Sequence, residues 1–169
     1  MRGLVPGLAL LVCGCGARTT LDVPLAEGCV LETKILQAPS TTPWFDTGID
    51  VTAGQQLHIT ATGTVRYGGD PKQVTDANGG HYTGKKFFTT TVLPTTVVVS
   101  LTGKVGGTTA VDTGTLLLEG TPNDGPGFVG TSYDEIVPES GRLFLGFNDR
   151  EQAFGDNSGA FTVTITLSC

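Results

Sequence analysis

The side chains most able to do chemistry are gathered in one short stretch of the chain, which reads FNDREQAFGDNSG. Asp149, Asp156 and Asn157 supply carboxylate and amide oxygens, while Gly155 and Gly159 allow the backbone to turn sharply and expose carbonyl groups. Ca²⁺ is held by about 6 to 8 oxygens of these kinds together with water. The stretch is therefore a candidate calcium loop. The alternative is that Asp, Asn, Ser and Gly serve only as ordinary turn residues.

A catalytic reading of the same stretch is weaker. Asp149, Glu151 and Asp156 could form the acid pair of a glycosidase, but metal ligation explains the same oxygens better. The chain has no Gly-x-Ser-x-Gly motif, and its two histidines, His58 and His81, lack the spacing of a zinc site. We therefore predict that the protein is not an enzyme. His58 falls within a predicted strand, where we expect it to have a structural role or to face the surface.

The composition limits the partners of the protein. The chain has 25 glycines among 169 residues, charged residues make up only 15%, and the net charge is −6. Such a sequence is rich in turns and is typical neither of helical nor of disordered proteins. Because Lys and Arg form no cluster, nucleic acid is a poor partner.

The hydrophobic pattern that must position these residues is that of strands. Residues 57–62 and 161–167 alternate between apolar and polar side chains, as half-buried strands do. Residues 95–102, 115–118 and 142–147 are short apolar runs between Gly-rich turns, which fits the core strands of a sandwich. The pattern predicts an all-β fold, an antiparallel β-sandwich of the jelly-roll type.

The first residues carry the features of an export signal rather than of a fold. Arg2 precedes a short apolar run that cannot span a bilayer and that ends in VCGC. This ending looks like a bacterial lipobox with Cys15 as the lipidated residue; a plain signal peptide cut nearby is the alternative. We predict a lipoprotein signal peptide over residues 1–14, a tether over 15–28 and one domain over 29–169, exported and lipid-anchored to the outer membrane or cell surface.

Two cysteines remain in the predicted mature domain, Cys29 at its start and Cys169 at its end. Exported proteins meet an oxidising environment, so we expect these two to form a disulfide. The bond would join the first strand to the last.

Three blocks, in order along the chain, resemble one known family. They are ATGTVRYG, LTGKVG and FNDREQAFGDNSGAFTVTI. Over about residues 43–168 the chain is similar to the PA-I galactophilic lectins, which are bacterial, calcium-dependent and galactose-binding. That family has a jelly-roll sandwich with one Ca²⁺ at an end of the sandwich, and sugar hydroxyls complete the coordination shell of the metal.

The resemblance implies a set of metal ligands. Asp149 would bind Ca²⁺ with its carboxylate, Asp156 and Asn157 would bind through side-chain oxygens, and Tyr67 and Ala153 would bind through backbone carbonyls. The family usually has an amide at the position of Asp156, so this chain adds a negative charge there.

The resemblance also implies sugar contacts by Asp149, Arg150, Asp156 and Asn157, with the Arg150 side chain pointing away from the metal. The loop over residues 70–88 differs from that of the family, and His81 is its candidate contact to the sugar. Trp44 could stack on a sugar, but a core role is favoured.

Two functions follow from these expectations. The first is calcium-dependent binding of a galactose-type glycan, with contact to a membrane only through the lipid anchor. The second is a structural or adhesion sandwich, with or without calcium, that binds no free sugar. The pattern leaves the oligomeric state open.

Overall fold

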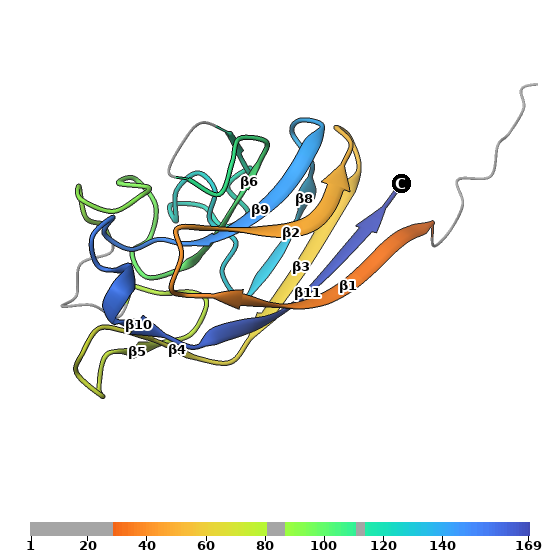
Figure 1. The fold of residues 1–169 in the computed structure, drawn as a ribbon. Helices are drawn as coiled ribbons and strands as arrows, with labels where there is room; N and C mark the ends of the chain where they lie inside the picture. Colours follow the sequence, from red (N-terminus) through yellow and green to blue (C-terminus); the bar gives the residue numbers. More distant parts are fainter. Residues whose placement is uncertain (1–28, 81–86, 111–113) are drawn as a thin grey trace, which may run out of the picture.

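The computed structural model describes residues 29–80, 87–110 and 114–169, and they fold into antiparallel sheets (Figure 1). One four-stranded sheet has the order β1 (Val30–Pro39), β11 (Ala160–Ser168), β3 (Gln56–Thr62), β8 (Ser132–Ile136). The other has the order β2 (Trp44–Val51), β9 (Gly141–Phe147), β6 (Leu101–Val105), β7 (Thr115–Leu116). A small sheet has the order β10 (Asn157–Ser158), β4 (Val65–Tyr67), β5 (Val74–Thr75).

The predicted all-β sandwich is confirmed, and helix is limited to one short 3₁₀ turn, η1 (Phe154–Asp156), within the described ranges. The core is formed by the alternating side chains of the two large sheets. In β11 the inward residues are fully buried, and they are Phe161, Val163, Ile165 and Leu167. Across the sandwich, β9 contributes Leu143, Leu145 and Phe147. The rings of Phe147 and Phe161 lie 6.2 Å apart between their centroids, which joins the two layers.

Trp44 is buried, as expected, but it packs on its own sheet, β2-β9-β6-β7, and is not part of the central core between the sheets. It lies opposite Gly146 in the β2–β9 pair, and a Cβ at that glycine would stand 2.6 Å from the indole ring. The Lys104 ammonium lies 4.6 Å from the centroid of the same ring. Trp44 is therefore enclosed by its own sheet and does not line the pocket described below.

One predicted strand is wrong in most of its length. Of residues 95–102 only Leu101 and Thr102 belong to a strand, the beginning of β6, and residues 95–100 form turns. The run 115–118 forms a strand only over β7, whereas the other three predictions match β3, β11 and β9. Val99 has a φ of 52°, a left-handed conformation that a β-branched residue rarely adopts. Strand propensity is thus overridden here by contacts described in the next section.

The two ends of the domain are joined by the expected disulfide between Cys29 and Cys169, whose Cα atoms lie 5.6 Å apart. In Figure 1 the C-terminus and the start of β1 lie at one end of the sandwich, and β4, β5 and β10 lie at the other. The signal peptide, the tether and Cys15 fall within residues 1–28, outside the described ranges, so they stay predictions of the sequence.

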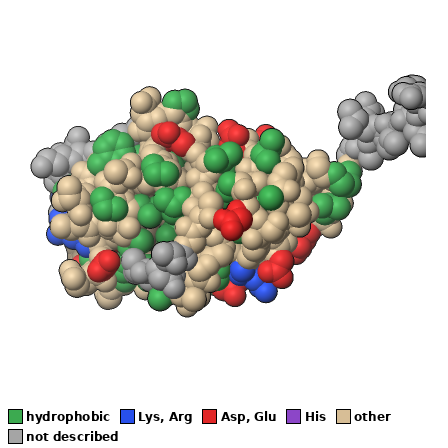
Figure 2. Space-filling model, turned by 90° about the horizontal axis from the view of Figure 1, so that it is seen from above, with side chains coloured by type: hydrophobic (Ala, Val, Ile, Leu, Met, Phe, Trp, Pro, Cys, Tyr) green, Lys and Arg blue, Asp and Glu red, His purple; other side chains and the backbone are tan. Residues whose placement is uncertain are grey.

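The surface is mixed in character. On the face shown in Figure 2, apolar side chains are spread among polar ones, and the basic side chains lie toward its margins rather than in a stripe. His58 is half-exposed on β3, with its Nδ1 atom 3.8 Å from Asp134, in agreement with the surface role expected for it. Among the described residues, no helix is long and apolar enough to cross a membrane.

Candidate metal centre

The chain leaves β9 through Asn148, which organises the surrounding loops. Its side chain is fully buried; Nδ2 lies 3.0 Å from the carbonyl oxygens of Leu93, Thr96 and Val97, and Oδ1 accepts a hydrogen bond from the Leu93 amide. Its backbone carbonyl also accepts a hydrogen bond from Val99. One amide side chain thus bends the segment 93–99 away from the sheet and holds it beside the loop that follows β9.

Asp149, the next residue, is buried with only 6% of its surface exposed. Its Oδ2 accepts a hydrogen bond of 2.9 Å from Asn157, and its Oδ1 accepts one of 2.8 Å from the backbone amide of Arg150. Burial raises the pKa of Asp149 above its ordinary value, because a charged carboxylate is costly to remove from water, although the two hydrogen bonds act in the opposite direction. The nearby charge of Asp156 raises this pKa further. A neighbouring cation would stabilise the charged form of a carboxylate that is buried in this way.

Asn157 stands beside Asp149 because of the small sheet at this end of the sandwich. It lies opposite Tyr67 in the β10–β4 pair, and its Nδ2 donates both to Asp149 and to the carbonyl of Ser40, the latter at 3.0 Å. Its Oδ1 is buried and, in the part of the chain that the structure describes, has no hydrogen-bond partner. A buried acceptor without a partner costs free energy unless a ligand satisfies it.

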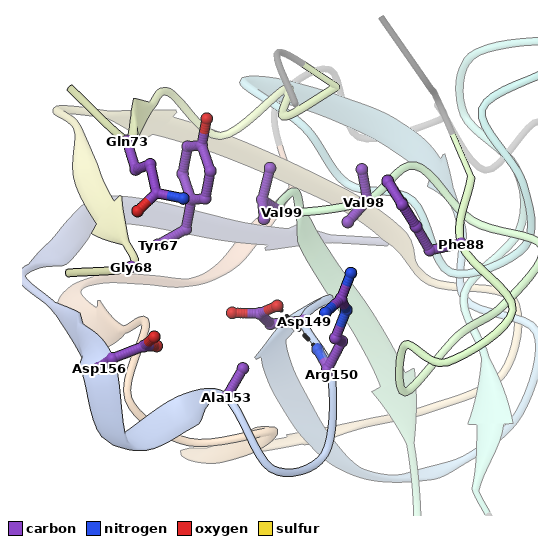
Figure 3. Close-up of a pocket in the computed structure, with 10 residues that line it drawn as sticks. All are labelled: Tyr67, Gly68, Gln73, Phe88, Val98, Val99, Asp149, Arg150, Ala153 and Asp156. Atoms are coloured by element: carbon purple, nitrogen blue, oxygen red, sulfur yellow. Dashed lines mark hydrogen bonds between the residues drawn. The ribbon is translucent and has the colours of Figure 1, made fainter. Parts of the chain in front are cut away.

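A pocket of about 120 Å³ opens between these loops (Figure 3). The residues that line it are Tyr67, Gly68, Gln73, Phe88, Val98, Val99, Asp149, Arg150, Ala153 and Asp156. In Figure 3 the carboxylates of Asp149 and Asp156 face the same space, with the methyl group of Ala153 below them and Tyr67 and Gly68 across from them. The valines and Phe88 form an apolar wall, so the pocket has an oxygen-rich side and an apolar side.

The donors at this pocket fit a hard divalent cation. Within the described ranges no three His, Cys, Asp or Glu side chains gather as metal ligands. A cation here would therefore rely on carbonyl and amide oxygens besides the two carboxylates, as Ca²⁺ commonly does. The unpartnered Asn157 oxygen and the buried Asp149 carboxylate are the two groups that such an ion would satisfy. The Ala153 carbonyl already accepts a hydrogen bond from Asp156 at 3.2 Å, which leaves its second lone pair for a ligand.

The structure brings most of the predicted site residues together. Tyr67, Asp149, Ala153 and Asp156 line one pocket, and Asn157 is hydrogen-bonded to Asp149 although it does not itself line the pocket. The Arg150 side chain points away from Asp156 and forms part of the pocket wall (Figure 3). His81 lies outside the described residues, so its contact with the sugar stays a prediction of the sequence.

Other lining residues were missed by the sequence analysis. Gln73 and Phe88 lie in the loop over residues 70–88, which the resemblance singled out with His81 as the only residue named there, whereas Val98 and Val99 come from a segment that no local motif marks. Asn148 was missed as well, although an asparagine directly after an apolar strand was an available signal. Of the two glycines in the loop, Gly159 has a φ of +94° and needs to be glycine, whereas Gly155 has neither a positive φ nor a neighbour within 4 Å of a Cβ. Gly155 lies in the 3₁₀ turn η1, so the chain turns there as expected, but the geometry does not require a glycine at this position.

Comparison with known proteins supports the fold and leaves the family open. No protein-family model and no curated protein matches the chain. Among solved structures, the chain is similar to one described as "EclA N-terminal domain; PllA-like lectin", with a TM-score of 0.52 and 20% sequence identity. The similarity covers 82% of this chain and 98% of that one. The domain thus has the β-sandwich fold of a lectin domain, while membership of the PA-I family stays a prediction.

Proposed function

We propose that this domain binds Ca²⁺ in the pocket beside Asp149 and uses the metal to hold a galactose-type sugar. The observation that carries the proposal is a buried Asp149 carboxylate in the lining of the pocket, hydrogen-bonded to Asn157, whose own side-chain oxygen is buried and has no partner among the described residues. Asp149 and Asp156 would ligate through carboxylates and Asn157 through its amide oxygen. Tyr67 and Ala153 would ligate through their carbonyls.

The sugar would bind through the metal as much as through the protein. Two neighbouring hydroxyl groups of a galactose-type ring can replace water on Ca²⁺, and the ligand carboxylates can accept hydrogen bonds from the same hydroxyls. The apolar side of the pocket, with Val98 and Phe88, offers a surface for the C–H groups of the ring. Because few other contacts are needed, the affinity of one site is expected to be modest. The lectin fold of the solved neighbour supports a glycan as the ligand class.

Calorimetry of the domain with galactosides, first in Ca²⁺ and then in chelator, tests this proposal. Sugar binding is expected in Ca²⁺ and should vanish in chelator, and the melting temperature should fall in chelator because the metal binds only the folded state. Asp149→Ala should abolish binding of both metal and sugar, Asn157→Ala should weaken both, and Asp156→Asn should be milder because its amide oxygen can still ligate.

Asp134→Ala is the matched control, because it removes an exposed carboxylate on β8, outside the pocket. It should leave both affinities unchanged. Calcium heat without sugar heat would contradict the lectin function and favour a structural or adhesion role. A melting curve of Asp149→Ala that matches the wild type with and without Ca²⁺ would contradict the metal site itself.

Export and anchoring at Cys15 form a second part of the proposal. Tyr67, which lines the pocket, belongs to β4, and β4 lies at the end of the sandwich opposite the start of β1 (Figure 1). A tether over residues 15–28 would therefore join the domain at the end far from the pocket. Fractionation of a Cys15→Ser variant provides the test. The protein should move from the membrane fraction to the soluble fraction, and unchanged membrane association would refute the lipid anchor.

A further inference from the structure

Arg150 places a positive charge in the wall of the pocket. Of the residues that line this pocket in the described ranges, only Asp149, Arg150 and Asp156 carry charged side chains. Arg150 is exposed, and in Figure 3 its side chain runs along the apolar side of the pocket, between Asp149 and Phe88. The pocket therefore combines two carboxylates on one side with a guanidinium on the other.

The position of Arg150 is fixed from both its backbone and its side chain. Arg150 forms an isolated β-bridge with Thr91. Its backbone amide donates a hydrogen bond to the side chain of Asp149, and its backbone carbonyl accepts one of 2.9 Å from the amide of Ala153. Its guanidinium carbon lies 5.7 Å from the centroid of the Phe88 ring, within the range of a cation–π contact. The aromatic ring thus holds the guanidinium beside the pocket without using its N–H donors.

Those donors are available to a ligand. Among the described residues, the Arg150 guanidinium forms no salt bridge and no hydrogen bond. Arg142, by contrast, has its Nε 2.9 Å from a carboxylate oxygen of Asp50 and its Nη1 3.6 Å from Asp46. The charge of Arg150 acts on the nearby Asp149 carboxylate, but the two side chains form no direct ion pair. The five N–H groups of Arg150 remain for a molecule in the pocket.

The charged side chains around the pocket indicate which sign of charge a ligand should carry. A divalent cation would balance the two carboxylates, Asp149 and Asp156, and Arg150 would then leave the described lining of the pocket with one net positive charge. A neutral sugar would leave that charge unmatched. A guanidinium fork binds carboxylates and sulfates through two parallel hydrogen bonds, which a neutral hydroxyl group cannot provide.

We propose that the sugar recognised by this site is anionic: a galactose-type ring that carries a carboxylate or a sulfate, with its hydroxyls toward the metal and its anionic group on Arg150. This inference rests on the proposed function, since the ring is placed by the Ca²⁺ site. It adds a specificity-determining residue, because Arg150 would select among sugars that the metal alone does not distinguish.

Calorimetry in Ca²⁺ with galactose, galacturonic acid and galactose 6-sulfate tests the inference. At least one of the two anionic sugars should bind about tenfold more tightly than galactose, as expected for hydrogen bonds to a charged group. The advantage should shrink as NaCl is raised, because the site is open to solvent. Arg150→Gln should remove the preference for anionic sugars over galactose, and Arg150→Lys should keep part of it.

Arg142→Gln is the matched control for the loss of one positive charge, and it should keep the full preference. Equal affinity for galactose and both anionic sugars would overturn this inference and leave the proposed function intact. A preference for anionic sugars that persists in Arg150→Gln would place the anion on the metal and overturn it too. If none of the three sugars binds in Ca²⁺, the inference and the proposed function fail together.

Discussion

The last strand and the segment 95–100 are both rich in β-branched residues, but the first forms a regular strand and the second forms turns. Residues 161–167 alternate threonine with apolar residues and form β11, which pairs with β1 on one side and with β3 on the other. Residues 95–100 read TTVVVS, are even richer in β-branched residues, and are bent into turns. Both segments are largely buried, so burial alone does not distinguish them.

The difference lies in where their backbone groups find partners. The amides and carbonyls of β11 are paired by two neighbouring strands in a regular register. The carbonyls of Thr96 and Val97 are paired instead by the side chain of Asn148, and Val99 adopts a left-handed conformation beside it. The regular region builds the core, whereas the irregular region supplies Val98 and Val99 to the wall of the pocket. Strained backbone of this kind is often found at ligand sites.

Removal of the Asn148 side chain should have the largest effect on this contrast. Asn148→Ala is expected to lower the free energy of unfolding by about 4 kcal/mol, because it leaves several buried backbone groups without partners. The affinity for Ca²⁺ should fall as well, since the loop after β9 loses its support. Urea unfolding and calcium calorimetry measure the two effects.

Thr164→Ala in β11 is the comparison variant, because it removes a polar side chain from the regular ladder, whose backbone bonds remain. It should cost about 1 kcal/mol or less and leave calcium binding unchanged. Similar losses for Asn148→Ala and Thr164→Ala would show that the irregular segment does not depend on Asn148.

A smaller effect separates two buried valines, Val163 in β11 and Val99 in the pocket wall. Val163→Gly should cost about 3 kcal/mol, since it removes a buried side chain and loosens a strand. Val99→Gly loses a similar contact but relieves a left-handed backbone, a strain worth about 1 to 3 kcal/mol. It should therefore cost about 2 kcal/mol less than Val163→Gly in urea unfolding. Equal losses would mean that the backbone at position 99 carries no strain.

The local pattern of apolar and polar residues was sufficient to predict the all-β architecture. Alternation in 57–62 and 161–167 has the period of a strand, and a period of two puts every second side chain into the core whatever the strand pairs with. The oxygen-bearing loop was also visible, since Asp149, Asp156 and Asn157 are close along the chain. Local sequence thus determined which residues could face a core and which loop could hold a metal.

The tertiary structure decided which distant groups meet that loop. The pairing of β10 with β4 sets Asn157 opposite Tyr67, and Asn148 draws the segment 93–99 to the pocket. Tyr67 was indicated only by the resemblance to a lectin family and by no local pattern. No local pattern predicts that Phe88 holds the Arg150 guanidinium at the pocket wall either. These contacts join residues far apart in sequence, and they depend on loop closure and on buried hydrogen bonds that exist only once the two sheets have packed.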